Sequence, residues 1–497
     1  MKKDNLFEIE VAPAKPFDQG TPHINGPEIY GASPGRDFLY SMPVRGARPL
    51  KFSWFGNIPA GLKLDSETGF ITGQATSEGR YQVTLNVENA AGRANKPFEI
   101  VIATDQLCLT PLLGWTSWNA FSHVVSEQKV RKTAEKLVDT GLAARGYSYI
   151  NIDSAWQGQR LKNNQPIPPN ENFPDMAGLV SYIHRLGLKA GIYSTPMVHA
   201  WGHYPDRIVL PGETGYPLNP EYFQGYFGGC GSEHYEHIDA AQWAEWKFDY
   251  VKYDWPVCDP YHTELMAKEL RNTGRDFVLS LTTGCDILHI EAYKKYANMC
   301  RSNIDTADTW ETILANAFPP EHWEKCTGPG TWFDMDMLAL GVMTIASGPK
   351  PVPAPNRLSR NEMITHMSLW ALFPSPLQIS CDLEKLDDFT MSLLANEELL
   401  DINQDKLGRC AVCVAHNHDD EGNSETRVYK RELADGSYAA AFINLGNEAA
   451  EITFERTGRK FEDVRDVWAL KDLDSAKDRI ALGVPAHGTR VIRFKYK

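Results

Sequence analysis

The feature that most constrains this chain is a regular alternation of short apolar runs and helix-like segments between residues 108 and about 400. Eight runs have the composition of buried strands, and segments between them such as Glu127–Leu142 and His262–Asn272 have helical periodicity. Eight strand–helix units over roughly 250–300 residues are typical of a closed (β/α)8 barrel. The alternative, a doubly wound sheet, requires a glycine-rich phosphate-binding turn after its first strand, and Leu113–Trp118 lacks that pattern.

The regions on either side of this alternation lack helical periodicity. Near the start of the chain, turn clusters such as Asp65–Gly69 separate short strand-like runs, and apolar residues alternate strictly from Tyr81 to Val87. The pattern at 59–73 resembles that of Ig-like domains. Strand-like runs return after residue 400, for example Tyr438–Leu445. We therefore predict a multidomain chain with an N-terminal Ig-like β-sandwich (1–105), a central (β/α)8 TIM barrel (106–400) and a C-terminal antiparallel β-sandwich (401–497).

Charge and composition narrow the class of partner. The chain has 50 Lys and Arg against 64 Asp and Glu, a net charge of -14, which argues against nucleic acids and anionic membrane surfaces. No apolar run is long enough for a membrane-spanning helix. Thirteen Trp residues are explained either by large hydrophobic cores or by sugar binding, because the apolar face of a pyranose packs on an indole ring. We expect an oligosaccharide or polysaccharide substrate, and no pattern predicts the oligomeric state.

The cysteine spacing indicates whether the chain binds a metal, and the N-terminal residues indicate its cellular location. Cys410 and Cys413 form a CxxC pair, but a zinc site needs a second pair at matching spacing, so we expect no metal and no cofactor. Met1–Asp4 is charged like the start of a signal peptide, and no apolar segment follows it. We expect an extracytoplasmic protein, periplasmic or secreted, whose signal peptide is absent from this chain, with a cytoplasmic location as the alternative.

Several of the eight runs stop abruptly at charged or aromatic residues. In a barrel the chemistry lies at the C-terminal ends of the strands. A single Asp there is explained by capping of the next helix, but five runs with the same ending predict an active site. Two carboxylates with a lysine beside one of them suggest glycoside hydrolysis, since Lys252 would keep Asp254 ionised. The strand-end residues are Asp153, Tyr193, Asp254, Arg301 with Asp305, and Asp334.

The motifs around these residues resemble those of glycoside hydrolase family 27, which contains α-galactosidases, α-N-acetylgalactosaminidases and β-L-arabinopyranosidases. The resemblance runs in order from about 108 to 410. The matching segments are Leu113–Asn119, Asn151–Trp156, Lys252–Asp254, Arg301–Asp305 with Trp310, Trp332–Leu338, Leu369–Leu383 and Ile402–Gly408.

The resemblance implies a retaining hydrolase of terminal α-D-galactosyl residues. Asp254 would be the nucleophile and Asp305 the acid/base, with carboxyl groups roughly 5–5.5 Å apart. Asp305 must begin protonated and Asp254 ionised, so their pKa values must differ. Asp308 is the alternative acid, although a salt bridge or a helix cap would also explain it. The resemblance implies a substrate-binding set of Trp118, Asp153, Ser154, Tyr193, Lys252, Thr282, Arg301 and Asp334, in which Asp334 holds Arg301 or a sugar hydroxyl.

Two departures from the family pattern leave the sugar open. Ser154 stands where α-galactosidases usually have a second Asp, which favours a sugar without C6, such as L-arabinopyranose. Thr282 stands where the family often has Glu, which leaves room for a 2-acetamido group. By resemblance, Cys230 and Cys258 could form a disulfide beside the nucleophile, and this pairing stays open.

Two other classes of function remain to be considered. A non-catalytic carbohydrate-binding protein on the same scaffold would not need both Asp254 and Asp305. Residues 334–336 also match the short DxD motif of metal-dependent glycosyltransferases, but no Rossmann-like frame accompanies it.

Overall fold

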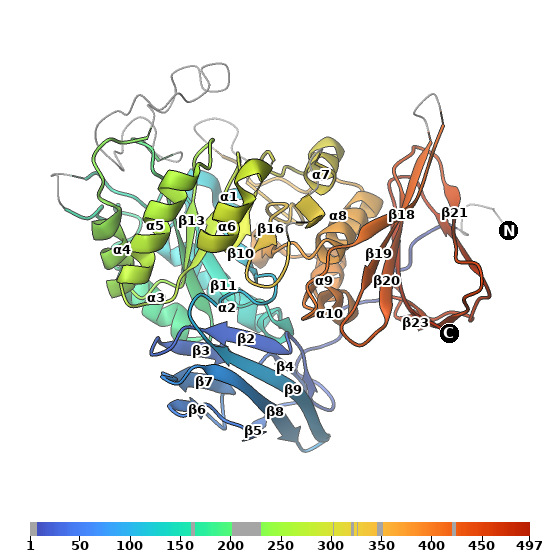
Figure 1. Cartoon of the computed structure of the whole chain (residues 1–497), viewed down its shortest axis with the longest axis horizontal. Helices are drawn as coiled ribbons and strands as arrows, with labels where there is room; N and C mark the ends of the chain where they lie inside the picture. Colours follow the sequence, from blue (N-terminus) through green and yellow to red (C-terminus); the bar gives the residue numbers. More distant parts are fainter. Residues whose placement is uncertain are drawn as a thin grey trace.

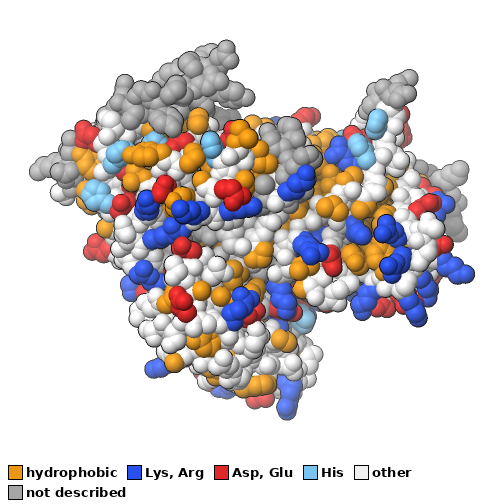
Figure 2. Space-filling view, in the orientation of Figure 1, with side chains coloured by type: hydrophobic (Ala, Val, Ile, Leu, Met, Phe, Trp, Pro, Cys, Tyr) orange, Lys and Arg blue, Asp and Glu red, His pale blue; other side chains and the backbone are white. Residues whose placement is uncertain are grey.

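The computed structural model describes residues 7–160, 165–200, 230–301, 303–319, 323–325, 327–344, 351–419 and 424–497. Figure 1 shows the N-terminal strands in blue below the central helices and strands, and the C-terminal strands in red to one side. Figure 2 shows acidic and basic side chains interspersed over the same face, with hydrophobic side chains between them. No helix among the described residues is long and apolar enough to cross a bilayer.

The central region is built on eight parallel strands. Their spatial order is β16-β15-β14-β13-β12-β11-β10-β17, and a parallel bridge between Leu338 and Ile379 joins the segment after β16 to β17. This TIM-barrel-like sheet confirms the predicted fold class. The strands are β10 (Leu113–Thr116), β11 (Tyr149–Ile152), β12 (Lys189–Ser194), β13 (Tyr250–Tyr253), β14 (Val278–Leu281), β15 (Met299–Cys300), β16 (Trp332–Phe333) and β17 (Leu377–Ile379).

Helices cover the outside of this sheet, and local sequence explains where they begin. α2 (Glu127–Asp139) begins where the Ser126 side chain accepts the Lys129 N–H, and α5 (Pro260–Asn272) begins at an Asp259 cap followed by proline. Both helices were predicted within three residues of these bounds. The other helices are α1 (Trp118–Phe121), α3 (Met176–Arg185), α4 (Glu236–Glu245), α6 (Ile290–Tyr296), α7 (Trp310–Ala317), α8 (Arg360–Leu372), α9 (Asp388–Leu394) and α10 (Glu397–Asn403).

The N-terminal region is a pair of facing sheets, ordered β2-β9-β8-β5 and β3-β7-β6. Val83, Leu85 and Val87 of β8 are buried, so the predicted alternation does mark one inward face. The strands are β2 (Ile29–Ala32), β3 (Phe38–Ser41), β5 (Lys51–Gly56), β6 (Leu62–Leu64), β7 (Phe70–Gly73), β8 (Gly79–Asn89) and β9 (Gly92–Ile102), with a separate pair β1 (His23–Ile24) and β4 (Val44–Arg45).

The C-terminal region is also all-β, and it packs against helix α8. Trp468 Nε1 donates to Ser368 Oγ at 3.0 Å, and Arg431 Nη1 donates to the Ala371 carbonyl at 3.0 Å. α8 is buried almost all round, because this sheet covers the face that would otherwise meet solvent. The two sheets are β18-β19-β20-β25-β22-β23 and β21-β24, with strands β18 (Val412–His418), β19 (Glu425–Glu432), β20 (Tyr438–Asn444), β21 (Ala450–Glu455), β22 (Phe461–Asp466), β23 (Lys471–Asp472), β24 (Arg479–Val484) and β25 (Thr489–Tyr496).

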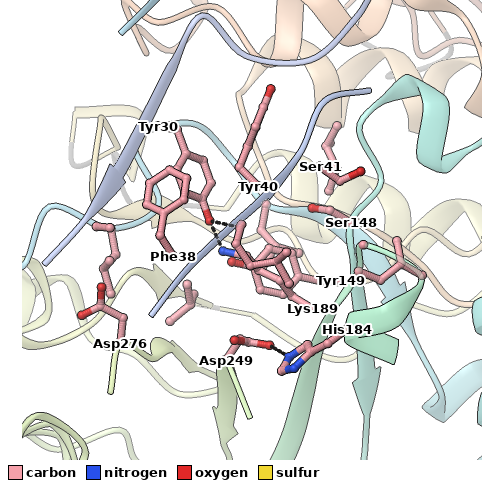
Figure 3. Close-up of a pocket in the computed structure, with 18 of the residues that line it drawn as sticks. Tyr30, Phe38, Tyr40, Ser41, Ser148, Tyr149, His184, Lys189, Asp249 and Asp276 are labelled. Atoms are coloured by element: carbon pink, nitrogen blue, oxygen red, sulfur yellow. Dashed lines mark hydrogen bonds and ion pairs between the residues drawn. The ribbon is translucent and has the colours of Figure 1, made fainter. Parts of the chain in front are cut away.

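The N-terminal sheets dock under the barrel, at the ends where its strands begin. Lys189, the first residue of β12, donates to the hydroxyl of Tyr30 from β2. Asp249 accepts a hydrogen bond from His184 Nε2 at 2.8 Å in the same seam. These residues line a cavity of about 760 Å³ between the two regions (Figure 3). The N-terminal region therefore leaves the opposite, C-terminal ends of the barrel strands uncovered.

Candidate active site

The structure places the predicted site residues at the C-terminal ends of neighbouring barrel strands. Asp153 follows β11, Lys252 lies in β13 and Asp254 follows it, and Thr282 follows β14. Arg301 follows β15 and Asp334 follows β16. Because parallel strands end at one face of a barrel, residues spread over 180 positions of sequence meet there.

A buried ion pair anchors one side of the site. Lys252 Nζ lies 2.7 Å from Asp153 Oδ2, and the side chains are 16 % and 3 % exposed. Burial disfavours the charged lysine, but the carboxylates of Asp153 and Asp254 outweigh it and raise the pKa of Lys252. The backbone N–H of Asp153 donates to Ser117 Oγ at 2.9 Å, which fixes the start of the loop after β11. The lysine thus stays charged and holds Asp153 in one orientation.

Asp254 is held by the neighbouring strand. The hydroxyl of Thr282 donates to Asp254 Oδ1, and the backbone N–H of Asp254 donates to the Ser194 carbonyl at 2.9 Å. Burial raises the pKa of Asp254, while Lys252 and the Thr282 hydrogen bond oppose that rise. Thr282 therefore orients the predicted nucleophile. This role was not expected from the sequence, which predicted only that its small side chain leaves room for a 2-acetamido group.

Arg301 connects the second predicted catalytic residue to the floor of the site. Its Nη1 donates to Asp336 Oδ1 at 2.7 Å, and its Nη2 contacts Thr283 Oγ1 and Asp305 Oδ1. The guanidinium is buried, whereas the Asp305 side chain is 66 % exposed. Asp305 thus reaches from a fixed cation toward solvent, the position that a group exchanging protons with water requires.

The pKa directions of the two predicted catalytic carboxyls are the reverse of those expected. Desolvation opposes ionisation of Asp305, but the adjacent Arg301 outweighs it and lowers the pKa of Asp305. The pKa of Asp254 is raised by burial. The ion pair with Arg301 favours the carboxylate form of Asp305, so the expected role of Asp305 as the acid requires a change in these surroundings when substrate binds.

Asp336 is a site residue that the sequence reasoning missed. Asp334, rather than Asp336, was expected as a partner of Arg301, but the hydrogen bond from Nη1 goes to Asp336. Asp336 Oδ2 also accepts the Thr306 N–H at 2.6 Å, and its carbonyl accepts Trp370 Nε1 at 2.8 Å. Its φ of 71° is unusual for a residue other than glycine, and such backbone is concentrated at functional sites. The DxD spacing at 334–336 was the signal that could have found it.

Asp334 lies in the same loop with a different environment. Its Oδ1 accepts the backbone N–H of Asp336 at 2.8 Å. Burial, reinforced by the charge of Asp336, raises the pKa of Asp334 to about 7. Asp334 is therefore a carboxyl that can donate or accept a hydrogen bond near neutral pH.

The remaining predicted binding residues lie close to this centre. Tyr193 is buried, and Lys252 Nζ lies 5.8 Å from the centre of its ring. Ser154 is buried, and its N–H donates to Asp153 Oδ1 at 2.7 Å. Trp118 is the first residue of α1 and is half-buried. The site therefore joins polar groups to partly accessible aromatic surface.

Three other tryptophans at the strand ends belong to the core. Trp115, Trp156 and Trp255 are at most 1 % exposed. Their indole N–H groups donate to the Cys381 carbonyl, the Tyr193 carbonyl and Asp259 Oδ2, at 2.9, 2.8 and 3.2 Å. Their position near the site thus reflects packing, and Trp118 is the one of these four with accessible surface.

The structure also bears on two alternatives that the sequence left open, the role of Asp308 and the Cys230–Cys258 disulfide. Asp308 accepts Arg357 Nη2 at 2.6 Å and the Arg357 backbone N–H at 2.9 Å, so it forms the salt bridge that was its ordinary explanation. Cys258 is a thiol whose Sγ donates to the Thr282 carbonyl at 3.4 Å, so the disulfide with Cys230 is not formed. Within the described ranges, no group of three His, Cys, Asp or Glu side chains is arranged to hold a metal ion.

Comparisons with known proteins agree with this geometry. The family model described as "Alpha galactosidase A" matches residues 110–210 and 222–405, and the one described as "Alpha galactosidase C-terminal beta sandwich domain" matches 423–494. An Ig domain family matches 21–103. Alpha-galactosidase A of Cellvibrio japonicus is 31 % identical over 78 % of this chain and 93 % of its own length. Alpha-galactosidase 2 of Arabidopsis thaliana is 30 % identical over 79 % of this chain and 91 % of its own.

Solved structures give the same result. A Bacteroides fragilis protein aligns with a TM-score of 0.81 at 29 % identity, over 96 % of this chain and 98 % of its own. A family 27 β-L-arabinopyranosidase from Geobacillus stearothermophilus aligns with a TM-score of 0.67 at 26 % identity, over 78 % and 96 %. The family match covers more than half of the chain and most of the length of its relatives. The chain therefore belongs to the alpha galactosidase A family, glycoside hydrolase family 27, and is a glycosidase.

Proposed function

We propose that this glycosidase removes terminal α-D-galactosyl residues with retention of configuration, through a covalent glycosyl-enzyme. The observation that carries the proposal is the placement of Asp254 and Asp305 on one barrel face, each held by its own donor. Thr282 holds Asp254, and Arg301 holds Asp305. The alpha-galactosidases among the relatives support galactose as the sugar.

In the first step Asp254 attacks the anomeric carbon while Asp305 donates a proton to the leaving oxygen. In the second step Asp305 takes a proton from water, which then attacks the same carbon and releases the sugar from Asp254. Lys252 stabilises the carboxylate form of Asp254 throughout, because it is the largest opponent of the pKa rise that burial causes.

The first step requires a protonated Asp305, and we infer that substrate binding supplies this state. Arg301 lowers the pKa of Asp305, and the Asp305 side chain is 66 % exposed. A sugar seated against Asp305 displaces water from the carboxyl, and desolvation raises the pKa of an acid. The same sugar adds hydroxyl donors and acceptors around Arg301, which then divides its hydrogen bonds among more partners.

Asp153, Lys252, Arg301 and Asp334 are proposed to bind the sugar hydroxyls. Asp153 Oδ1 and Oδ2 already accept hydrogen bonds from Ser154 N–H and Lys252, which leaves the carboxylate rigid and able to accept from a hydroxyl. Trp118, which keeps accessible surface, is proposed to pack against the carbon face of the ring. Tyr193 was also expected there, but it is buried as fully as the core tryptophans, so its proposed role is to pack against Lys252. A rigid set of charged acceptors and donors favours one arrangement of axial and equatorial hydroxyls.

Ser154 supports a second candidate, a β-L-arabinopyranosidase with the same mechanism. A buried serine in place of a second carboxylate removes one charged acceptor that would bind a primary hydroxyl. L-Arabinopyranose has no C6 and loses nothing by that change. The structural similarity to the Geobacillus stearothermophilus enzyme is consistent with this alternative.

The deciding experiment compares kcat/KM on p-nitrophenyl α-D-galactoside and p-nitrophenyl β-L-arabinopyranoside. We expect the galactoside to be preferred, and Ser154→Asp to increase that preference further. A wild-type preference for the arabinoside would replace galactose by arabinopyranose in the proposal. Binding without hydrolysis of any glycoside would instead favour a carbohydrate-binding protein.

The catalytic roles have their own test. Asp254→Asn should abolish turnover without unfolding the protein. With the wild-type enzyme, NMR of the first-formed sugar should show the same anomeric configuration as the substrate. Asp308→Asn is the matched control, because it makes the same chemical change in a buried carboxylate outside the proposed mechanism. Full activity of Asp254→Asn, or an inverted product, would contradict the assigned roles.

A further inference from the structure

Two buried cysteines adjoin the residue that holds the proposed nucleophile. Cys258 follows β13 and Cys285 follows β14. Their Sγ atoms lie 3.4 and 3.5 Å from the same atom, the carbonyl oxygen of Thr282. The backbone N–H of Cys258 donates to the Gly284 carbonyl at 3.3 Å, so the two segments are also joined through their main chains. The thiols are therefore neighbours, although the helix α5 and the strand β14 separate them in sequence.

The two sulfur atoms differ in acidity. Burial raises the pKa of Cys258 well above its ordinary value, so it stays a thiol. Burial also acts against ionisation of Cys285, but the hydrogen bonds from Cys258 and Cys300 and the charge of Arg301 outweigh it and lower the pKa of Cys285. A thiolate is the reactive form of cysteine. Cys285 is thus the sulfur that ionises more readily, and it lies beside Cys258, which stays protonated.

We propose that Cys258 and Cys285 form an oxidation site at which hydrogen peroxide closes a disulfide and inactivates the enzyme. The Cys285 sulfur attacks one peroxide oxygen and breaks the O–O bond, which gives a sulfenic acid and hydroxide. Cys258 then attacks the sulfenic sulfur and releases the second oxygen as hydroxide. The proton of Cys258 and one proton from solvent convert the two hydroxides to water. The two sulfurs together lose two electrons, and peroxide is reduced to two molecules of water. A dithiol reverses the change by exchange.

Closure of this disulfide disturbs the active site through Thr282. The Cys258 S–H, which lies within hydrogen-bonding distance of both the Thr282 carbonyl and Cys285, is lost, and drawing the sulfurs into bonding distance moves one or both segments. The hydroxyl of the same Thr282 donates to Asp254 Oδ1. A shift of this residue therefore misplaces the nucleophile, and this consequence rests on the proposed role of Asp254.

Burial limits which oxidants can reach the pair. Cys258 is 1 % and Cys285 is 6 % exposed, whereas Cys413 is an exposed cysteine on β18. A bulky thiol reagent should therefore react with Cys413 and spare the pair, while peroxide, which is close to water in size, should reach both. Cys381 is another buried thiol, just after β17, and burial raises its pKa to about 12. It is the matched control for a buried cysteine whose thiol does not ionise readily.

The test treats the full-length protein with hydrogen peroxide and follows both activity and disulfides. We expect a cross-linked peptide pair containing Cys258 and Cys285 by non-reducing mass spectrometry, and loss of activity that dithiothreitol restores. Cys258→Ser and Cys285→Ser should each lose activity at least tenfold more slowly, relative to their own starting rates, than Cys413→Ser and Cys381→Ser.

Two results would overturn the proposal: absence of this cross-link from peroxide-inactivated protein, or equal inactivation rates in all four variants. The cross-link is measured without any substrate, so it stands or fails independently of the sugar specificity. If a serine variant fails to fold, the presence or absence of the Cys258–Cys285 cross-link in the peroxide-inactivated wild-type protein tests the proposal.

Discussion

Replacement of Asp336 by asparagine tests whether this residue positions the catalytic machinery through Arg301. Asp336 Oδ1 accepts Arg301 Nη1 at 2.7 Å, and Oδ2 accepts the Thr306 N–H at 2.6 Å. An asparagine of the same shape has one acceptor oxygen and an NH2 group, so one of the two donors must face another donor. The substitution therefore removes one hydrogen bond and the ion pair without creating a cavity.

The size of the effect follows from those contacts. A hydrogen bond to a charged group contributes about 1.5–3 kcal/mol. If Arg301 is displaced, the free energy of this hydrogen bond is lost from stabilisation of the transition state, because the same guanidinium contacts Asp305. Since about 1.4 kcal/mol corresponds to a factor of ten, kcat/KM should fall roughly 10- to 150-fold.

The matched control is Asp308→Asn. Asp308 is buried to a similar extent as Asp336, and like it accepts an arginine at one oxygen and a backbone N–H at the other. Its arginine, Arg357, is not a proposed site residue. Both variants should lose thermal stability, but Asp308→Asn should keep kcat/KM near the wild-type value on the preferred aryl glycoside.

The comparison can refute the reasoning in two ways. Equal losses of kcat/KM in the two variants would mean that Asp336 contributes only to folding. An unchanged kcat/KM in Asp336→Asn would mean that Thr283 and Asp305 suffice to hold Arg301.

Three further predictions follow from other contacts. Lys252→Met leaves Asp153 as a buried, uncompensated carboxylate, so the free energy of unfolding should fall by about 3–5 kcal/mol and activity should be lost; denaturant titration and kinetics check both. Lys189→Met removes the contact with Tyr30 at the opposite end of the barrel, so it should lower the melting temperature while kcat/KM is retained. Burial opposes ionisation of Asp249, but His184, Arg275 and Lys189 outweigh it and lower the pKa of Asp249 to about 2. The Asp249 carboxylate therefore stabilises the folded protein by about 2 kcal/mol above about pH 4. This stabilisation is lost as the pH falls from 4 to 2. Thermal unfolding against pH should show a flatter acid limb in Asp249→Asn, and identical limbs would contradict the assignment.

The order of elements and the location of the site followed from the sequence. Helical periodicity between eight apolar runs implied a barrel, and the structure has a sheet of eight parallel strands in this region. The polar endings of the runs implied a shared site, because parallel strands in a barrel all end at the same face. Asp153, Lys252, Asp254, Arg301 and Asp305 met there as expected.

Which groups contact one another inside the site was decided only by the tertiary structure. Arg301 bonds Asp336 rather than Asp334, because the backbone of Asp336 turns into the left-handed region and presents both of its oxygens to donors. Cys258 is hydrogen-bonded to Cys285, and Trp115 belongs to the core although it lies near a strand end. Sequence periodicity reports the direction of a side chain relative to its own element, whereas a hydrogen-bond partner depends on backbone angles and burial contributed by several elements at once. The same physics sets the acidity of Asp305, which depends on Arg301 and on contact with water rather than on residue type.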